Sequence, residues 1–369
     1  MFSNNRKISI RQARRLMILD LFGISSLLLP GLLAGTAGTD GIFCIAAAAL
    51  LAFGYLWLLE KVMVQVKGDY YSYLKRVAGG VFADILMIFY LFFFLLLAAF
   101  GLYQLTGLIR AWLLPEGSFG WICFLLLAVA AYAAVRGMEV RARIYEILFW
   151  ILGVPLLVML LLAVRGVNVD YWTPVASASV SGFFRGTMTV FAFFLPLFFI
   201  QFLKPWCARP ERLSGSARWA VGITAALNMA IYLILLGTFQ VKTTEALKRP
   251  IITLMSMVKL PGEFFARLDA FMTAIWFFSL FALINTGVFY SGHVLKEFFR
   301  EKKTDYGLLA VLVLAFGAAR WFFIYPRAEE IFAMYVKWVA MPVLVLLPIL
   351  LIFLGKLRNR REGKVGGDV

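Results

Sequence analysis

Long apolar runs, separated by short polar and mostly basic segments, are the dominant pattern of this chain. Most runs reach the ~20 residues that a helix needs to cross the hydrocarbon core of a bilayer. Unpaired backbone groups are so unfavourable in that core that each run is expected to be helical. The pattern predicts ten transmembrane helices, at residues 14–34, 41–63, 81–109, 119–135, 144–164, 183–203, 217–241, 264–293, 307–324 and 331–354.

The layout of these runs repeats within the chain. Each of the first five runs is matched by the run five places later, and the third and eighth runs are both unusually long. Because each half holds an odd number of helices, the second copy is inverted in the membrane, as in many secondary transporters. We therefore expect one all-α transmembrane domain over 1–369, a five-plus-five inverted repeat. Its repeats lie at about 11–164 and 182–354, followed by a basic cytoplasmic tail at 355–369.

Two corresponding runs carry residues that break helices. The first has Pro30-Gly31 shortly after Gly23, Ser25 and Ser26, and the sixth has Pro196 at the matching depth. Proline removes one helical hydrogen bond and collides with the preceding turn. Inverted-repeat transporters use such breaks to expose backbone groups at the bilayer midplane. The sequence predicts broken helices 1 and 6, with an ordinary proline kink as the alternative for either one.

Composition excludes a soluble protein. Apolar residues make up 63% of the 369 positions and charged residues 15%, against about 45–50% and about 25% in soluble domains. The formal net charge of +16 would also suit a nucleic-acid partner. The basic residues, however, stand in short clusters between apolar runs, as cytoplasmic loops do. We expect contact with a lipid bilayer and no nucleic acid.

The sequence shows no catalytic or metal-binding motif. Cys44, Cys123 and Cys207 lack CxxC spacing, which argues against a disulfide framework or a zinc site. The single histidine, His293, has no second histidine with which to hold a metal. We expect no enzymatic activity, no cofactor and no metal.

The predicted breaks define the candidate ligand site. Gly23, Ser25 and Ser26 would offer backbone and hydroxyl groups at the first break. A half-helix N-terminus carries about half a positive charge, which would suit a ligand carboxylate. The residues before the second break would line a pocket for the rest of the ligand; they are Phe191, Ala192, Phe193 and Phe194.

Charged residues inside membrane runs are functional candidates by default. Asp20 lies one or two turns before the first break and is our candidate for a carboxylate that couples an ion. Its alternative is an ion pair with a basic cytoplasmic loop. Asp269 lies in the eighth run with Thr273 on the same helical face. Both are included in the candidate ligand site, although Arg267 could instead mark the outer membrane surface there.

Three stretches together resemble the B-subunit permeases of spore-germination receptors. They are ISIRQ at 8–12 with GISSL at 23–27 and PG at 30–31, RGME at 136–139 with Arg143 and Glu146, and RLDA at 267–270 with Trp276. The resemblance implies a LeuT-like, amino acid–polyamine–organocation fold in the spore inner membrane. It also implies a germinant-sensing role beside an A-type subunit and a lipoprotein C-type subunit. Many members carry a Gly-Glu pair where this chain has Phe194-Leu195.

Three interpretations of function remain. In the first, the chain is the sensing subunit of a germinant receptor and binds a nutrient, most simply an amino acid, at the breaks of helices 1 and 6. In the second, it is an autonomous proton- or cation-coupled amino-acid transporter, for which Asp20 would be the coupling residue. The third is a scaffold that binds nothing, which the Phe194-Leu195 departure keeps open.

The distribution of positive charge predicts the orientation of the chain. On one side of the ten predicted helices the loops and termini hold 25 Lys and Arg residues, against 8 on the other side. The positive-inside rule places the richer side, with both termini, in the cytoplasm. A reporter fused to the C-terminus should therefore be active only in the cytoplasm. An extracellular signal from that fusion would contradict the topology.

Overall fold

The protein is all-helical wherever its structure is described. The computed structural model describes residues 7–66, 68–257, 268–299 and 305–365, and the side chains within these ranges except at 268–273, 305 and 359–365. In these ranges the only extended pairing is an isolated bridge between Ile8 and Cys207. The main helices are α1 (Ile10–Ala37), α2 (Gly41–Gln65), α3 (Tyr70–Ala78), α4 (Gly80–Trp112), α5 (Phe119–Val135), α6 (Met138–Ala163), α7 (Val180–Ala192), α8 (Phe199–Leu203), α9 (Leu213–Ala246), α10 (Pro250–Met257), α11 (Leu268–Phe299), α12 (Asp305–Ile324), α13 (Ala328–Tyr335) and α14 (Met341–Val365).

Most of these helices are long and apolar, as the sequence predicts. By length and hydropathy, seven helical stretches of the described chain could cross a membrane, or eight if a bent pair counts as one span. The first stretch, Ile10–Gln65, contains both α1 and α2, and α5 falls below the length limit. The predicted number of ten spans is therefore not confirmed by this criterion. The all-helical membrane architecture is confirmed.

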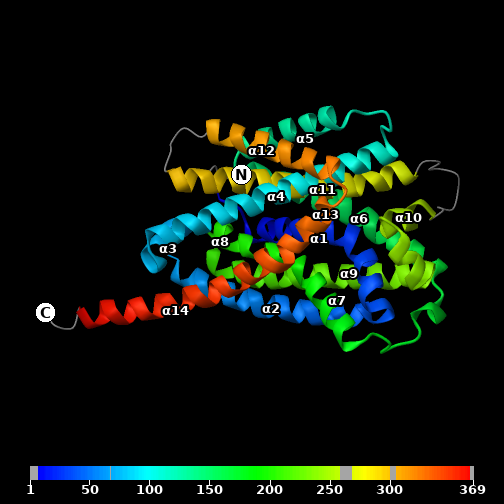
Figure 1. Cartoon of the computed structure of the whole chain (residues 1–369), viewed down its shortest axis with the longest axis horizontal. Helices are drawn as coiled ribbons and strands as arrows, with labels where there is room; N and C mark the ends of the chain where they lie inside the picture. The colour runs from blue at the N-terminus through cyan, green and yellow to red at the C-terminus, as the bar shows by residue number, and fades with distance from the viewer. Residues whose placement is uncertain (1–6, 67, 258–267, 300–304, 366–369) are drawn as a thin grey trace.

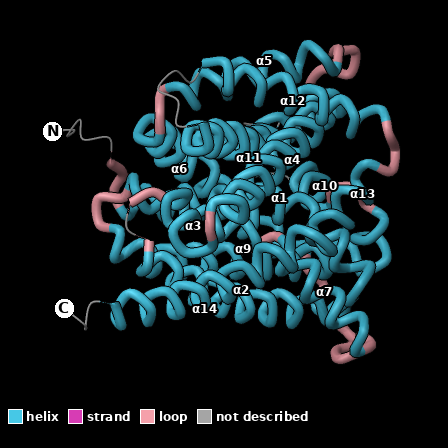
Figure 2. Tube along the Cα trace, turned by 60° about the vertical axis from the view of Figure 1, so that its left-hand side comes forward, coloured by secondary structure: helices cyan, strands magenta, loops and turns pink. Residues whose placement is uncertain are grey.

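Helix α1 lies at the centre of the bundle (Figure 1). It packs against α9 on one side and α11 on the other, and also contacts α6 and α7. Helix α4 lies along α11 and α12, while α2 lies along α7 and α9. Two groups of helices thus enclose α1, and in Figure 2 its start and the end of α14 lie at the same end of the bundle.

The predicted break in the first helix is wrong. Helix α1 runs without interruption from Ile10 to Ala37 and contains Pro30. The hydroxyls of Ser25 and Ser26 donate to the carbonyls of Phe22 and Gly23, at 3.1 and 3.2 Å, one turn earlier. Close packing by neighbouring helices allows a membrane helix to tolerate proline, and α1 is packed against α6, α7, α9 and α11. Helix α1 therefore continues through Pro30 without a break.

The predicted break in the sixth helix is confirmed. Helix α7 ends at Ala192, and a short 3-10 helix, η4 (Leu195–Phe198), follows with Pro196 in its first turn. The two parts are bent by 41° relative to each other. Proline is well suited to the first turn of a helix, where its missing N–H has no intrahelical role. The chain therefore restarts as a new helix at the bend.

The far end of this bent segment is anchored to two other elements. A last 3-10 turn, η5 (Lys204–Trp206), follows α8. The Lys204 ammonium donates to the carbonyls of Met63 and Val66 at the end of α2, at 2.5 and 2.7 Å. The Ile8 amide donates to the Trp206 carbonyl at 2.8 Å, just before α1 begins. The bent segment is thus tied to the end of α2 and to the start of α1.

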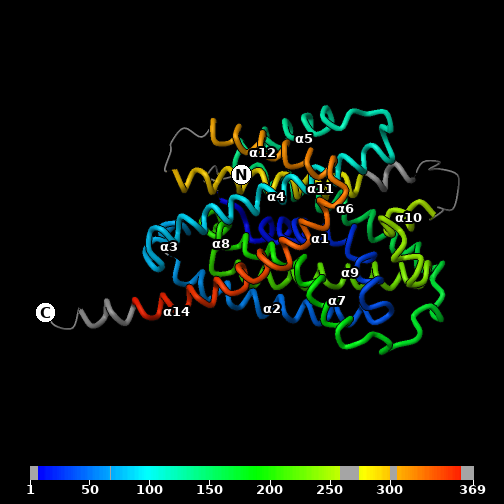
Figure 3. Tube along the Cα trace, viewed as in Figure 1, coloured from blue at the N-terminus to red at the C-terminus, as the bar shows by residue number. Residues whose placement is uncertain are grey.

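The last helix is longer than the sequence predicts and is interrupted. Helix α13 is joined to α14 by a π-helical turn, Val336–Ala340. Helix α14 then continues to Val365, so most of the expected basic tail at 355–369 is helical where it is described. The coloured part of α14 lies beside α2 and α3 (Figure 3).

One glycine sets how closely α4 and α11 approach. A Cβ added to Gly287 on α11 would lie 2.6 Å from the Phe94 carbonyl oxygen and 2.7 Å from Ala98 of α4. The Gly287→Ala variant should therefore be destabilised, by ~1–3 kcal/mol as expected for overpacking. Thermal unfolding of the purified protein in detergent measures the loss. Gly54→Ala on α2 is the control, because no atom lies within 4 Å of that Cβ. Equal melting temperatures for both variants would contradict the close packing.

Candidate functional site

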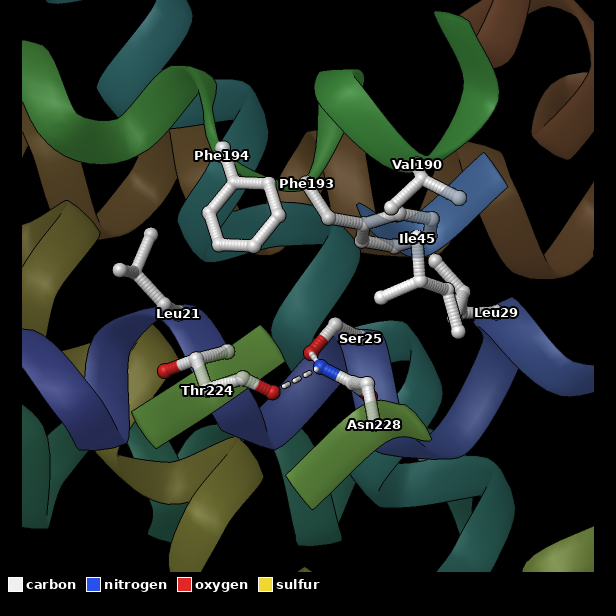
Figure 4. A pocket seen from close by; sticks show the side chains of 9 residues that line it. All are labelled: Leu21, Ser25, Leu29, Ile45, Val190, Phe193, Phe194, Thr224 and Asn228. Atoms are coloured by element: carbon white, nitrogen blue, oxygen red, sulfur yellow. Dashed lines mark hydrogen bonds between the residues drawn. The ribbon is translucent and has the colours of Figure 1, made fainter. Parts of the chain in front are cut away.

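A small cavity lies where the bend after α7 faces α1. Figure 4 shows its lining: Val190, Phe193 and Phe194 project from α7 and the bend toward α1 and α9. The cavity encloses about 210 Å³ of space between atoms. The nine lining residues are Leu21, Ser25, Leu29, Ile45, Val190, Phe193, Phe194, Thr224 and Asn228.

Three polar side chains stand together in this otherwise apolar lining. Asn228 is 3% exposed, and its Nδ2 donates to the Ser25 hydroxyl and to the Thr224 carbonyl, both at 3.0 Å. A carbonyl only accepts, so this contact fixes which end of the amide faces it. The Asn228 Oδ1 and the Thr224 Oγ1 have no hydrogen-bond partner among the described residues. A buried polar atom without a partner is unfavourable and needs an explanation.

Three of the predicted ligand-binding residues line the cavity, namely Ser25, Phe193 and Phe194. Gly23 and Ser26 face α11 instead. A Cβ on Gly23 would lie 2.9 Å from the Ser279 carbonyl oxygen. The Ser26 hydroxyl accepts from the Trp276 indole at 3.3 Å. The structure therefore places these two residues in helix packing and not in the cavity.

The remaining predicted residues are also outside the cavity lining. Phe191 is buried against the edge of Tyr55, with ring centroids 6.0 Å apart. Ala192 is partly buried at the end of α7. The side chains of Asp269 and Thr273 lie outside the described residues, so their part in the site stays a prediction.

Sequence reasoning missed the contribution of α9. It weighed charged residues within the apolar runs and passed over Thr224 and Asn228, which are neutral. An amide in the middle of the run 217–241, with a hydroxyl four residues earlier on the same helical face, was the available signal. Buried polar groups in membrane helices usually hydrogen-bond across helices, and Asn228 does so with Ser25.

Asp20 takes part in a buried ion pair that joins three helices. Its Oδ2 lies 3.2 Å from the Arg141 Nη2 of α6, and its Oδ1 accepts from the Thr286 hydroxyl of α11 at 2.6 Å. Asp20 is 2% exposed and Arg141 is fully buried. The rings of Tyr145, Phe289 and Tyr290 lie 4.9–5.3 Å from the guanidinium carbon. Aromatic faces add cation–π stabilisation to such a charge.

The placement of Arg141 corrects the sequence interpretation. Arg141 is one of the 25 basic residues that the sequence assigns to the cytoplasmic loops and termini, but it lies in the first turn of α6 and its side chain is buried. Arginine can reach away from its backbone position, and an available carboxylate makes the inward direction favourable. Asp20 lines a second cavity, of about 270 Å³, between α1, η4 and Tyr290. Its charge there is already balanced by Arg141.

Metal binding has no support in the described side chains, where no group of three or more His, Cys, Asp or Glu residues gathers. The lining of the first cavity is chemically suited to binding and not to bond breaking. It offers hydrogen-bond acceptors and apolar contact, without an acid, a base or a nucleophile held against a partner.

Comparison with known families now identifies the chain. Residues 7–330 match the sequence profile of the spore permeases, described as "Spore germination protein". The chain belongs to this family. It is therefore a membrane protein of the spore germination class, as the resemblance implied.

Curated relatives agree with this assignment. The chain is 24% identical to spore germination protein YndE of Bacillus subtilis (strain 168), over 98% of this chain and all of that protein. It is 23% identical to spore germination protein B2 of the same strain, over 85% of this chain and 86% of that one. Spore germination protein KB matches at 23% identity over 98% of both chains.

Solved structures show the fold. Mhp1, a nucleobase-cation-symport-1 family transporter in a closed conformation with bromovinylhydantoin bound, matches with a TM-score of 0.62 at 14% identity. That match covers 86% of this chain and 73% of Mhp1. A Na⁺-coupled sialic acid symporter in a substrate-bound outward-open state also matches at 0.62, with 12% identity and coverage of 89% and 79%. The chain therefore has the LeuT-like transporter fold, and family and fold point away from an enzyme.

The buried ion pair yields a prediction about stability. Arg141→Met would leave the Asp20 carboxylate buried without a cation, which typically costs ~3–5 kcal/mol. The double variant Asp20→Asn with Arg141→Met removes both charges and should recover most of that loss. Melting temperatures and the yield of monodisperse protein measure both effects. A double variant as unstable as Arg141→Met alone would show that the unpaired carboxylate is not the cause of the loss.

Proposed function

We propose that this chain is the membrane-embedded sensing subunit of a spore germinant receptor, and that it binds a small nutrient in the cavity between α1, α7 and α9. The chain's family is that of spore germination proteins, and its fold is that of small-molecule transporters. A subunit that senses a nutrient within the membrane would have both this family and this fold. The membrane in question is the spore inner membrane, with A-type and lipoprotein C-type subunits as the expected partners.

One observation carries this proposal. Asn228 Oδ1 and Thr224 Oγ1 have no hydrogen-bond partner among the described residues, and both side chains line the cavity beside the bend between α7 and η4. A bound ligand would supply the missing hydrogen bonds. The bend is also the place where the bundle can change shape, because the chain restarts there as a separate short helix. Occupancy of the cavity would then alter the bend angle and be transmitted to a partner subunit.

The pairing of Asp20 favours this proposal over the alternative of a proton- or cation-coupled transporter. Asp20 is the carboxylate that this interpretation requires, and it is held by Arg141 and Thr286. A fixed guanidinium removes the need for a transported cation at that carboxylate. This supports sensing over coupled transport.

The ligand contact can be tested in spores whose only copy of the gene carries Ser25→Leu. Leucine would fill the cavity and remove the hydroxyl that orients Asn228, so the nutrient response should be lost at normal protein levels. Ala128→Leu on α5 is the matched control, because that side chain is exposed on the bundle surface. An unchanged response in Ser25→Leu spores would contradict binding in this cavity.

Sensing and transport can be separated by two measurements on the wild-type chain. A receptor subunit should co-purify with proteins that carry large soluble domains and show no nutrient accumulation in proteoliposomes. Uptake by the isolated chain that depends on an ion gradient would establish the transporter instead. An amino acid as the nutrient stays a prediction of the sequence.

A further inference from the structure

Lys337 is an exposed cation within a stretch long and apolar enough to span the membrane. That stretch, Ala328–Arg358, comprises α13, the π-helical turn Val336–Ala340 and most of α14, and it crosses one face of the bundle in Figure 1. Lys337 lies in the π-helical turn, and its side chain is exposed on the surface of the bundle. Charged side chains inside membrane spans almost always face the bundle interior and pair with one another. Lys337 departs from this rule.

The depth of Lys337 in the membrane follows from the helix packed beside it. Helix α4 runs from Gly80 to Trp112, so its midpoint is four residues beyond Phe92. The ring centroids of Phe92 and Tyr335 are 5.6 Å apart, and Lys337 follows Tyr335 by two residues. At ~1.5 Å per helical residue, Lys337 is at most roughly 9 Å from the middle of α4. The hydrocarbon layer extends ~15 Å to either side of the membrane centre, so Lys337 lies inside it.

The chain itself provides no counter-charge for this lysine. Lys337 forms no ion pair with any described side chain. Its ammonium lies 5.2 Å from the ring centroid of Trp338, which is itself 70% exposed. A cation–π contact at an exposed site is weak compared with the cost of a lysine in hydrocarbon. The charge of Lys337 therefore calls for a partner outside this chain.

The surface around Lys337 is suited to a second membrane helix. Ile331, Met334 and Trp338 follow one another at spacings of three and four residues, and all three are exposed. They form an apolar stripe along one helical face, with Lys337 beside it. Membrane helices associate through apolar packing together with hydrogen bonds between polar side chains. The stripe offers the first, and Lys337 offers the second.

Two simpler occupants fit this surface less well. Lipid phosphate groups lie outside the hydrocarbon layer and so do not reach the depth of Lys337. A second copy of the chain would bring two like charges together. Among the described side chains, its carboxylates deepest within the spans, Asp20 and Glu146, are already paired with Arg141 and Arg15. The carboxylate must therefore come from a different protein.

We infer that Lys337 and the apolar stripe form a docking surface for a membrane-spanning helix of a different protein, and that this helix places an aspartate or glutamate beside the lysine. Docking would supply the missing negative charge and remove both charges from contact with lipid. The inference goes beyond the proposed function, because it concerns assembly and holds whether the chain senses or transports.

Crosslinking in the membranes of the producing strain tests what covers this surface. A photoreactive amino acid in place of Met334 stands on the exposed face, one turn from Lys337. Irradiation should give an adduct with another membrane protein, and the crosslinked span of that protein, identified by mass spectrometry, should contain an aspartate or glutamate. Adducts with lipid alone, or with a second copy of the chain, would overturn the inference.

The same adduct tests the part played by the charge. Its yield should fall about tenfold in the Lys337→Met background, as expected for loss of one polar contact between membrane helices. Lys356→Met is the matched control, because Lys356 is an exposed lysine nearer the C-terminal end of the same helix. An adduct that forms equally well without Lys337, or that depends as much on Lys356, would also contradict the docking surface.

A designed peptide separates the charge from the rest of a natural partner. The probe is a membrane-spanning peptide of leucine and alanine with one central glutamate, compared with the same peptide carrying leucine there. Energy transfer between the labelled full-length chain and the peptides in liposomes measures their association. The glutamate peptide should bind about tenfold more tightly, and Lys337→Met should abolish the difference. Equal binding of both peptides by the wild-type chain would count against the inference.

Stability distinguishes docking from a structural role of Lys337. Because the charge is uncompensated within the chain, Lys337→Met should leave the melting temperature in lipid nanodiscs unchanged or raise it. A marked fall would show that the lysine serves its own chain, and the inference would fail. Ser25→Leu, which tests the cavity, should leave the crosslinks at Met334 unchanged, so failure of the proposed function and failure of the docking surface are distinguishable.

Discussion

One requirement governs this structure. A polar group inside an apolar bundle must find its partner within the protein. Water is not available in the hydrocarbon core to solvate a stray donor, acceptor or charge. Asp20 meets the requirement through Arg141 and Thr286, which come from two other helices. The same ion pair therefore fixes how α1, α6 and α11 lie relative to one another. Asn228 Oδ1 and Thr224 Oγ1 are two of the buried atoms that lack a partner among the described residues, and both belong to side chains that line a cavity.

Structural features that follow from the local sequence were mostly predicted correctly. Apolar runs require helices in a bilayer, so the all-helical architecture followed from hydropathy. Pro196 lacks an N–H group and so favours the start of a new helix, and the bend lies just before it, between Ala192 and Leu195. The same reasoning failed at Pro30, where α1 continues. Whether a proline opens a helix depends on what surrounds it, and no local pattern reports the neighbouring helices that pack around α1.

The site was predicted only in part, for a related reason. Ser25, Phe193 and Phe194 lie in the cavity because they flank positions where breaks were expected. Asn228 and Thr224 escaped notice because their importance depends on being left without partners, which is a property of the assembled bundle. Arg141 was misplaced because a charge near a helix end can turn either toward water or inward. Its direction is decided by Asp20, more than a hundred residues away in the sequence.

The anchoring of the bent segment has a mechanical consequence. Helix α1 is a single rod in contact with α6, α7, α9 and α11, so moving it would disturb four interfaces at once. The pieces after the bend are short, and they end where Lys204 caps α2 and Trp206 meets Ile8. The short segment after the bend therefore starts at the cavity wall and finishes between the end of α2 and the start of α1. A displacement of Phe194 is expected to appear there as strain on a few hydrogen bonds. The end of the molecule that holds Ile8 would then register occupancy of the cavity without the ligand itself moving through the protein.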